Sequence, residues 1–405
     1  MLRLLLLGAW LVRGSALRPT TGPRASLAAG NWVKFICGAS NQDLPLIRNL
    51  CLVYTLAGVD CIDLSADPAV VSAAHEGVAR ALELSLLPDE AAARPKPLLM
   101  VSVNDNEDLH FRKASFDPSK CPSDCPRPCE RVCPAWAIPP LANLQQASAT
   151  AAAAVVATAT SASSEGVVTE RCYGCGRCIP TCPLGLIQGV SYVANRTAIA
   201  HLFQSGRVDA VEIHTQHGQT AAFAELWQQV GQSVLENAQI IAVSFPDMAD
   251  ATVPYITKLN DIISDHPDWP KFKGAQIWQT DGRPMSGDIG KGTAHSAITF
   301  GIKMLEEMHE AKTISGINLE STRHFVQIAG GTNDYSVTLG ESLGIQSKTG
   351  FGGFAFGGYA RREIGDVLRK LEDARPGTRL EDHRDELEVC LAFATKLVES
   401  VKKKK

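Results

Sequence analysis

Short apolar stretches alternate along most of the chain with longer segments whose apolar residues recur at helical spacing. Eight short stretches predict strands: WVKFIC (32–37), DCIDLS (60–65), LLMVSV (98–103), DAVEIH (209–214), IIAVSF (240–245), AQIWQT (275–280), FVQIAG (325–330) and GGFAFG (352–357). Six longer segments predict helices: 44–58, 69–86, 220–233, 253–264, 294–311 and 361–373. Apolar strands that alternate with amphipathic helices are typical of a parallel sheet covered by helices.

The number of strands predicts an α/β fold of the (β/α)8-barrel type. Six of the seven steps between strand starts are 27–50 residues long, whereas in the third step Asp209 comes 106 positions after Val103. The excess is enough for a small inserted module after the third strand, and the cysteine motifs described below indicate that this module is ferredoxin-like. An open, doubly wound parallel sheet plus a ferredoxin domain is the alternative.

These patterns divide the chain into five parts. They are a targeting presequence (1–30), the first part of the α/β domain (31–114), an iron–sulfur module (115–192) with a low-complexity insertion (145–166), the second part of the α/β domain (193–375), and a C-terminal helix with a lysine tail (376–405). The C-terminal helix is interpreted as a solvated surface tail. The insertion is rich in Ala, Ser and Thr, which is typical of a surface linker rather than a helical spacer.

Composition excludes several classes of protein. The chain has 405 residues, of which 45% are apolar and 20% are charged, as in an ordinary globular protein. Its net charge of −4 lacks the basic excess of a nucleic-acid-binding domain. After the N-terminus, no segment is apolar enough over about 20 residues to predict a membrane span. The oligomeric state is not indicated.

The N-terminus has the features of a targeting sequence. An apolar run from Leu4 to Val12 follows one arginine, and no acidic residue precedes Asp43. A signal-like run followed by an acid-free, Ser/Thr/Arg-bearing stretch resembles the bipartite presequence of algae with complex plastids. Ala16-Leu17-Arg18-Pro19 is the candidate cleavage region. This predicts the plastid stroma, with secretion as the alternative.

Eight of the twelve cysteines form two dense motifs. The second motif, CYGCGRCIPTCP, has the C-x2-C-x2-C-x3-C-P spacing of bacterial ferredoxins. Gly174 and Gly176 allow the unusual dihedral angles of such a loop. The fourth cysteine of each motif in a two-cluster ferredoxin binds the other cluster. The first motif, CPSDCPRPCERVCP, has wider gaps but ends in the same C-x3-C-P.

The two motifs therefore predict two 4Fe-4S clusters with exchanged fourth ligands. One cluster would use Cys121, Cys125, Cys129 and Cys182, and the other Cys172, Cys175, Cys178 and Cys133. Structural zinc and a disulfide framework are the alternatives, but zinc sites lack the Cys-Pro pattern and disulfide frameworks belong to short secreted chains. Cys37, Cys51, Cys61 and Cys390 lie in apolar segments and are expected to be buried core residues.

If the fold is a barrel, ligands bind on the loops that follow the strands. Gly330-Gly331 follows the seventh strand and Gly357-Gly358 the eighth, the two positions that commonly form a phosphate site. The loop after the sixth strand, TDGRPMSGDIGKGTAH, adds Arg283 and Lys291 as candidates for a charged ligand. These residues predict a flavin or another phosphate-bearing ligand; alternatively, the glycines only form turns. Asp63, Asn104, Asp105 and His214 end other strands.

Five motifs together resemble the light-dependent period protein (LdpA) family. They are NWVKFICGASNQDLPLIRNLC, DPSKCPSDCPRPCERVCPAWAI, RCYGCGRCIPTCPLGLI, QTDGRPMSGDIGKGTAH and IAGGTND, which lie in family order between about residues 31 and 370. The resemblance implies iron–sulfur clusters, a separate C-terminal domain and a role in conveying redox or light state. A plastid is expected to lack the bacterial clock partners, so a circadian role is not inferred.

Two functional classes remain. The first, slightly favoured, is a non-enzymatic redox sensor or electron carrier that exchanges electrons with a redox partner protein or donor. The second is an oxidoreductase in which the clusters pass electrons to a ligand in the barrel mouth. No G-x-G-x-x-G fingerprint follows the first strand, so a Rossmann-type nicotinamide site is not indicated.

Overall fold

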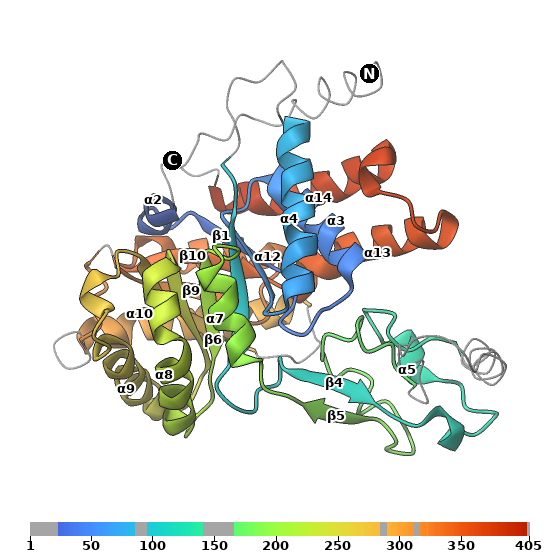
Figure 1. The fold of residues 1–405 in the computed structure, drawn as a ribbon, viewed down its shortest axis with the longest axis horizontal. Helices are drawn as coiled ribbons and strands as arrows, with labels where there is room; N and C mark the ends of the chain where they lie inside the picture. The colour runs from blue at the N-terminus through green and yellow to red at the C-terminus, as the bar shows by residue number, and fades with distance from the viewer. Residues whose placement is uncertain are drawn as a thin grey trace.

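The computed structural model describes residues 23–85, 95–140, 166–283, 290–311, 316–321 and 323–402. Its centre is a closed barrel of eight parallel strands (Figure 1). The strands are β1 (Trp32–Ile36), β2 (Cys61–Ser65), β3 (Leu98–Asn104), β6 (Ala210–His214), β7 (Ile240–Pro246), β8 (Ala275–Asp281), β9 (His324–Ala329) and β10 (Phe351–Phe356). The barrel closes because β1 pairs in parallel with both β2 and β10.

Each barrel strand is followed by a helix that packs outside the barrel. These helices are α3 (Leu44–Ala57), α4 (Pro68–Ser85), α7 (Arg196–Gln204), α8 (Thr220–Asn237), α9 (Thr252–Ser264), α10 (Lys291–Glu310), α12 (Asp334–Ser342) and α13 (Gly358–Ala374). The local sequence sets their ends. For example, the Asp43 side chain accepts a hydrogen bond from the Leu46 amide at the start of α3, and Gly58 ends that helix with a φ of 82°.

The prediction of a barrel is confirmed, and the open-sheet alternative is wrong. All eight predicted strands are present within one or two residues of their predicted bounds, and all six predicted helices are present. Sequence patterns missed α7 and α12, which are only nine residues long. Short helices carry few turns of periodic signal, so the pattern of their apolar residues is weak.

The predicted module is inserted between β3 and α7. It begins with β4 (Arg112–Ser115), contains the short helix α5 (Pro128–Arg131), and ends with β5 (Gln188–Ser191). β4 and β5 pair antiparallel, so both ends of the module leave the barrel side by side. Figure 1 shows this pair projecting from the barrel toward α5. The low-complexity insertion predicted at 145–166 lies, apart from its last residue, outside the described residues.

The N-terminal boundary differs from the expected one at residue 30. Residues 1–22 lie outside the described residues, but Pro23–Ala28 form helix α2. Leu27 is fully buried with the side chains that fill the amino-terminal end of the barrel, including Trp32 and Phe325. The last part of the expected presequence therefore belongs to the folded domain.

The C-terminal helix is not the solvated tail expected from its sequence. It forms α14 (Arg384–Lys402) and packs against α3 and α13. Leu387, Leu397 and Val398 are buried, and the Lys402 ammonium contacts the Asp60 carboxylate at 2.9 Å. The charged residues at the C-terminus led to the prediction of an exposed tail, although the helix has an apolar face.

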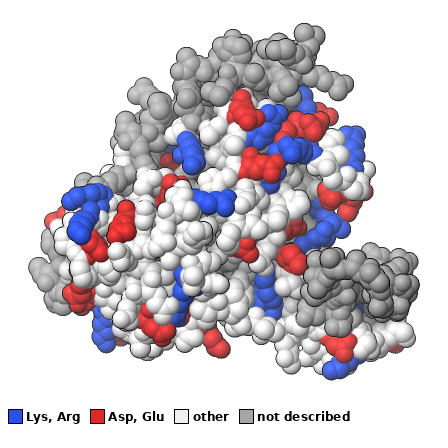
Figure 2. Space-filling model, viewed as in Figure 1, with Lys and Arg blue, Asp and Glu red and all other residues white. Residues whose placement is uncertain are grey.

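Cys37, Cys51, Cys61 and Cys390 are buried, as expected, and no disulfide joins any of the twelve cysteines, all of which lie in the described residues. Among the described residues, no helix has both the length and the apolar character needed to cross a membrane. On the face shown in Figure 2, basic and acidic residues are interspersed.

Leu397→Ala tests the packing of α14. The Leu397 side chain is 3% exposed, so its truncation is expected to lower the free energy of unfolding by about 2–4 kcal/mol. Val389→Ala on the same helix is the control, because Val389 is 57% exposed. Urea denaturation measures both. Equal, small effects would contradict a packed C-terminal helix.

Candidate iron–sulfur centres and barrel-mouth cavity

The second cysteine motif and the last cysteine of the first motif meet in one cavity. Cys133 lines it together with Cys172, Cys175 and Cys178. These are the four residues that the sequence assigns to one cluster with an exchanged fourth ligand. Two positive φ angles shape the loop, 73° at Gly174 and 76° at Gly176. A Cβ at Gly174 would lie 2.3 Å from the Arg112 carbonyl oxygen, so the tight loop requires glycine there.

Backbone amides already point at several of these sulfurs. The Ala114 amide donates to Cys172 Sγ at 3.3 Å, and the Ala137 amide donates to Cys133 Sγ at 3.3 Å. The Leu186 amide donates to Cys182 Sγ at 3.4 Å. Such bonds favour thiolate over thiol, which is the form that binds iron.

The remaining cysteines of the first motif gather around Cys182. Cys121, Cys129 and Cys182 contribute to the same small core of the module. Burial raises the pKa of Cys121, Arg127 lowers it, and the neighbouring Cys125 and Cys182 raise it further. Cys182 therefore lies near Cys121 of the first motif, within the same module core that also holds Cys133, Cys172 and Cys178.

The electrostatics of the cysteine cavity fit a cationic metal cluster. Burial, followed by repulsion from Cys175, Cys133 and Cys172, raises the pKa of Cys178 to about 12. Thiols packed this closely do not ionise together without a cation between them. Iron would supply that charge, and a set of four thiolates is the donor set that a 4Fe-4S cluster would need.

A second cavity lies at the carboxyl end of the barrel, beneath the inserted module. Its volume is about 120 Å³. Its wall contains Gly330, Gly331, Gly357, Gly358 and Arg283, five of the six ligand candidates named from the sequence. The sixth, Lys291, is exposed at the first residue of α10 and is not part of the described wall.

The module supplies one side of this cavity. Tyr173, Cys175 and Arg177 from the second motif line it, as does Pro134, which follows Cys133. The cavity therefore shares Tyr173 and Cys175 with the neighbouring cysteine cavity. A cluster held by Cys172, Cys175, Cys178 and Cys133 would lie next to any ligand in the barrel mouth.

The interior of the barrel below the mouth is polar. Lys34 of β1 forms a buried ion pair with Glu212 of β6 and donates to Gln279 Oε1 at 2.6 Å. Gln279 Nε2 donates to Glu212 at 2.7 Å and to Ser244 Oγ at 3.1 Å. Barrel interiors are usually filled by branched apolar residues, so a charged layer indicates a functional site. Sequence interpretation missed Lys34, Glu212 and Gln279, although polar residues within apolar strands were the available signal.

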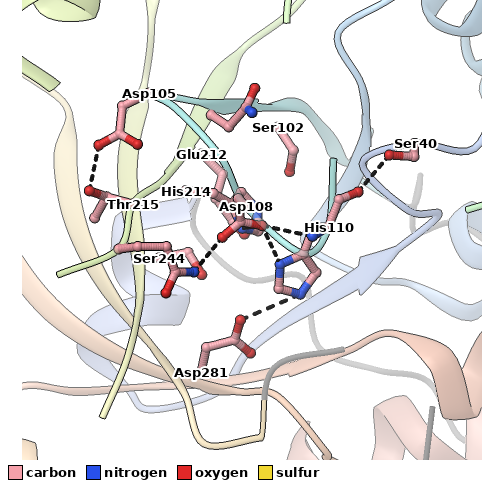
Figure 3. A network of polar contacts seen from close by, with 12 residues as sticks. Ser40, Ser102, Asp105, Asp108, His110, Glu212, His214, Thr215, Ser244 and Asp281 are labelled. Carbon is pink, nitrogen blue, oxygen red and sulfur yellow. Dashed lines mark hydrogen bonds and ion pairs between the residues drawn. The ribbon is translucent and has the colours of Figure 1, made fainter. Parts of the chain in front are cut away.

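Two histidines line the cavity above this layer. His110 Nδ1 lies 2.8 Å from Asp108 Oδ1, and His110 Nε2 lies 3.5 Å from Asp281 Oδ2. Figure 3 shows His110 held between these two carboxylates. Asp108 also accepts from the His110 amide, and its pKa is well below the usual range because hydrogen bonding to His110 outweighs burial. The arrangement orients the imidazole, leaving Nε2 on the Asp281 side for proton exchange.

His214 is a buried cation in the same network. Its Nε2 lies 3.0 Å from Glu212 Oε1, and its ring is 4.7 Å from that of His110. Burial disfavours its charged form, but Glu212 and then Asp108 outweigh that cost and raise the pKa of His214 to about 9. One ligand atom each from Asp108, His110 and His214 lie within 4.8 Å of one another, close enough to hold a metal ion.

The fold and the cysteine cavity together define an α/β-barrel protein with an inserted iron–sulfur-binding module. Comparison with known families supports this class. Residues 121–193 match the LdpA Fe-S cluster-binding domain, and residues 202–400 match the Light dependent period A C-terminal domain. The chain is 41% identical over 383 residues to "Light dependent period A" of Synechococcus elongatus, with 94% of each chain covered. The chain therefore belongs to the light dependent period A family.

The charge of His214 predicts a pH-dependent contribution to stability. Its folded-state pKa lies above the unfolded value of about 6.5, so the contribution is complete below that pH and is lost as pH rises through about 9. We expect the stability difference between the native protein and His214→Gln to shrink by roughly 3 kcal/mol between pH 6 and pH 10. Denaturant unfolding across this range measures it, with His309→Gln on the surface as the control. A constant difference would contradict a charged His214.

Proposed function

We propose that this protein binds two 4Fe-4S clusters and acts in electron transfer or redox sensing. The convergence of Cys133 with Cys172, Cys175 and Cys178 in one cavity carries the proposal. It supports the exchanged-ligand arrangement, in which the two clusters are close neighbours. A redox partner protein or electron donor would then reach the clusters through the exposed side of the module.

Cys175→Ala tests the cluster assignment. Anaerobically purified native protein should contain about eight iron atoms per chain, and the variant about four, since one of two 4Fe-4S clusters loses a ligand. One component of the reduced-state EPR spectrum should disappear. Cys390→Ala is the matched control, because this buried cysteine lies in α14, outside both motifs. Iron and acid-labile sulfide analysis would contradict two clusters if the native protein held only about four irons.

We further propose that the protein works in the stroma of a plastid. The acid-free segment before the first packed helix supports this, and α2 sets a limit on its length. A cleavage compatible with the folded barrel falls before Pro23, because Leu27 fills the end of the barrel. Redox state in a plastid follows illumination, which suits a sensor that passes this state to a partner.

A second candidate function is that of an oxidoreductase. The specific observation that favours it is that Cys175, the His110 imidazole and the buried Glu212 all line one cavity. Electrons would arrive from the side of Cys175, and protons from the side of His110. A pure electron carrier has no need of such a lined cavity or of an oriented imidazole.

Protein isolated anaerobically from its source organism distinguishes the two functions. If the barrel mouth binds a flavin, denaturation is expected to release flavin fluorescence in a fixed ratio to protein. A cluster-only absorption spectrum, with no small molecule detected by mass spectrometry after denaturation, would favour the electron carrier or sensor.

A further inference from the structure

The N-terminus of α13 faces the barrel-mouth cavity without a cap. The helix follows β10 directly, and its N-cap, Gly357, has no side chain to accept from the first amides. Gly357 and Gly358 both line the cavity. The unpaired amides and the dipole of a 17-residue helix therefore favour an anion at this end of the cavity. By contrast, the side chain of Asn333 caps the neighbouring α12.

Arg361, in the first turn of α13, is an independent sign of a ligand. It is 6% exposed and lines the cavity, yet it makes no ion pair with a described carboxylate. Its Nη1 donates to the Ile36 carbonyl at 2.9 Å, and its guanidinium lies 4.1 Å from the centre of the Tyr173 ring. Its Nε has no acceptor among the described residues. A buried N–H of a cation that lacks an acceptor, as Arg361 Nε does, is costly, and an anionic ligand would satisfy it.

The turn after β9 forms the facing side of the cavity. Gly330 and Gly331 have φ angles of 64° and 93°. The Arg283 amide donates to the Gly330 carbonyl at 3.0 Å, and Thr293 Oγ1 donates to the Gly331 carbonyl at 2.6 Å. Both carbonyl oxygens thus already accept hydrogen bonds, from the loop after β8 and from the start of α10, which reduces their repulsion of an anion.

Charge divides the cavity into two ends. At one end, Arg177 and Arg361 have no described carboxylate partner. At the other end, Asp63, Glu212 and Asp281 line the cavity floor. A ligand that fits both ends is anionic where it meets the arginines and uncharged or hydrogen-bonding where it meets the floor.

We propose that the barrel mouth binds a phosphate monoester, with its phosphate between the N-terminus of α13 and Gly330-Gly331. The phosphate would meet the Arg361 guanidinium and the amides of the first turn of α13, both of which donate hydrogen bonds. The rest of the ligand extends toward His110 and past Cys175. This inference deepens the second candidate function and rests on it, whereas the two-cluster proposal does not depend on it.

The experiment uses the full chain with its clusters intact and compares three probes by anaerobic isothermal titration calorimetry. Flavin mononucleotide, riboflavin and inorganic phosphate separate the contribution of the phosphate from that of the ring. We expect flavin mononucleotide to bind about 10- to 100-fold more tightly than riboflavin, since hydrogen bonds to a charged group account for the difference.

Gly357→Ala is the most informative variant. Its added Cβ would lie 3.7 Å from the nearest described atom, Ile36 Cδ1, so the fold accepts the methyl group while the methyl group narrows the phosphate site. Gly365→Ala is the matched control on the same helix, because its Cβ would also lie 3.7 Å from its nearest neighbour, in Trp136. Gly330→Ala is unsuitable, because its Cβ would lie 2.2 Å from Asp281 Oδ1.

Weaker phosphate-dependent binding in Gly357→Ala and Arg361→Gln, with Gly365→Ala unchanged, supports the proposal. Binding of inorganic phosphate alone, lost in Gly357→Ala, also supports it and points to a monoester other than a flavin. Equal affinity for flavin mononucleotide and riboflavin, or no binding of any probe, overturns it. Iron content, measured on every variant, shows whether the clusters remain and separates this result from the cluster proposal.

Discussion

An ion pair buried in the centre of the barrel constrains much of the rest of the molecule. Lys34 and Glu212 come from strands that are distant in sequence, and neither side chain reaches water. Two charges in such a place are stable only when each has further partners, because the loss of hydration is worth several kcal/mol per ion. Gln279 provides one partner and His214 another. The network therefore fixes which strands face one another, and it extends through His214 to the barrel mouth.

The inserted module covers this charged interior and is tied to it by specific contacts. Lys113 of β4 donates to the carbonyls of Thr169 and Cys172, each at 2.8 Å, and also to that of Ser40 in the loop after β1. On the other side, the Arg361 guanidinium stacks over Tyr173. The cysteine motif is thus joined to the loops of the first and last barrel strands. A change in ligand binding at Arg361 has a direct physical route to the residues that surround the cysteine cavity.

Much of the fold could be predicted from the sequence because the barrel repeats one simple pattern. Apolar strands of regular spacing identified all eight strands, and the one long interval located the insertion. Cysteine spacing likewise singled out Cys133, Cys172, Cys175 and Cys178, which share one cavity. The polar residues of the barrel mouth were harder to predict. Asp108 and His110 lie in a loop with no periodic signal, and the role of Lys34 depends on Glu212, 178 residues away. Charged C-terminal residues hid the packing of α14, whose apolar face only appears against α3 and α13.

The paired ends of the inserted module bear on how such a chain can arise and change. Arg112 lies opposite Ser191 in the β4–β5 pair, so the chain leaves the barrel and returns to it at neighbouring positions. An insertion at this point therefore leaves the order of the barrel strands unchanged. The residues that cover the pocket are encoded in one continuous segment of the chain, separate from the strands that carry its charged interior.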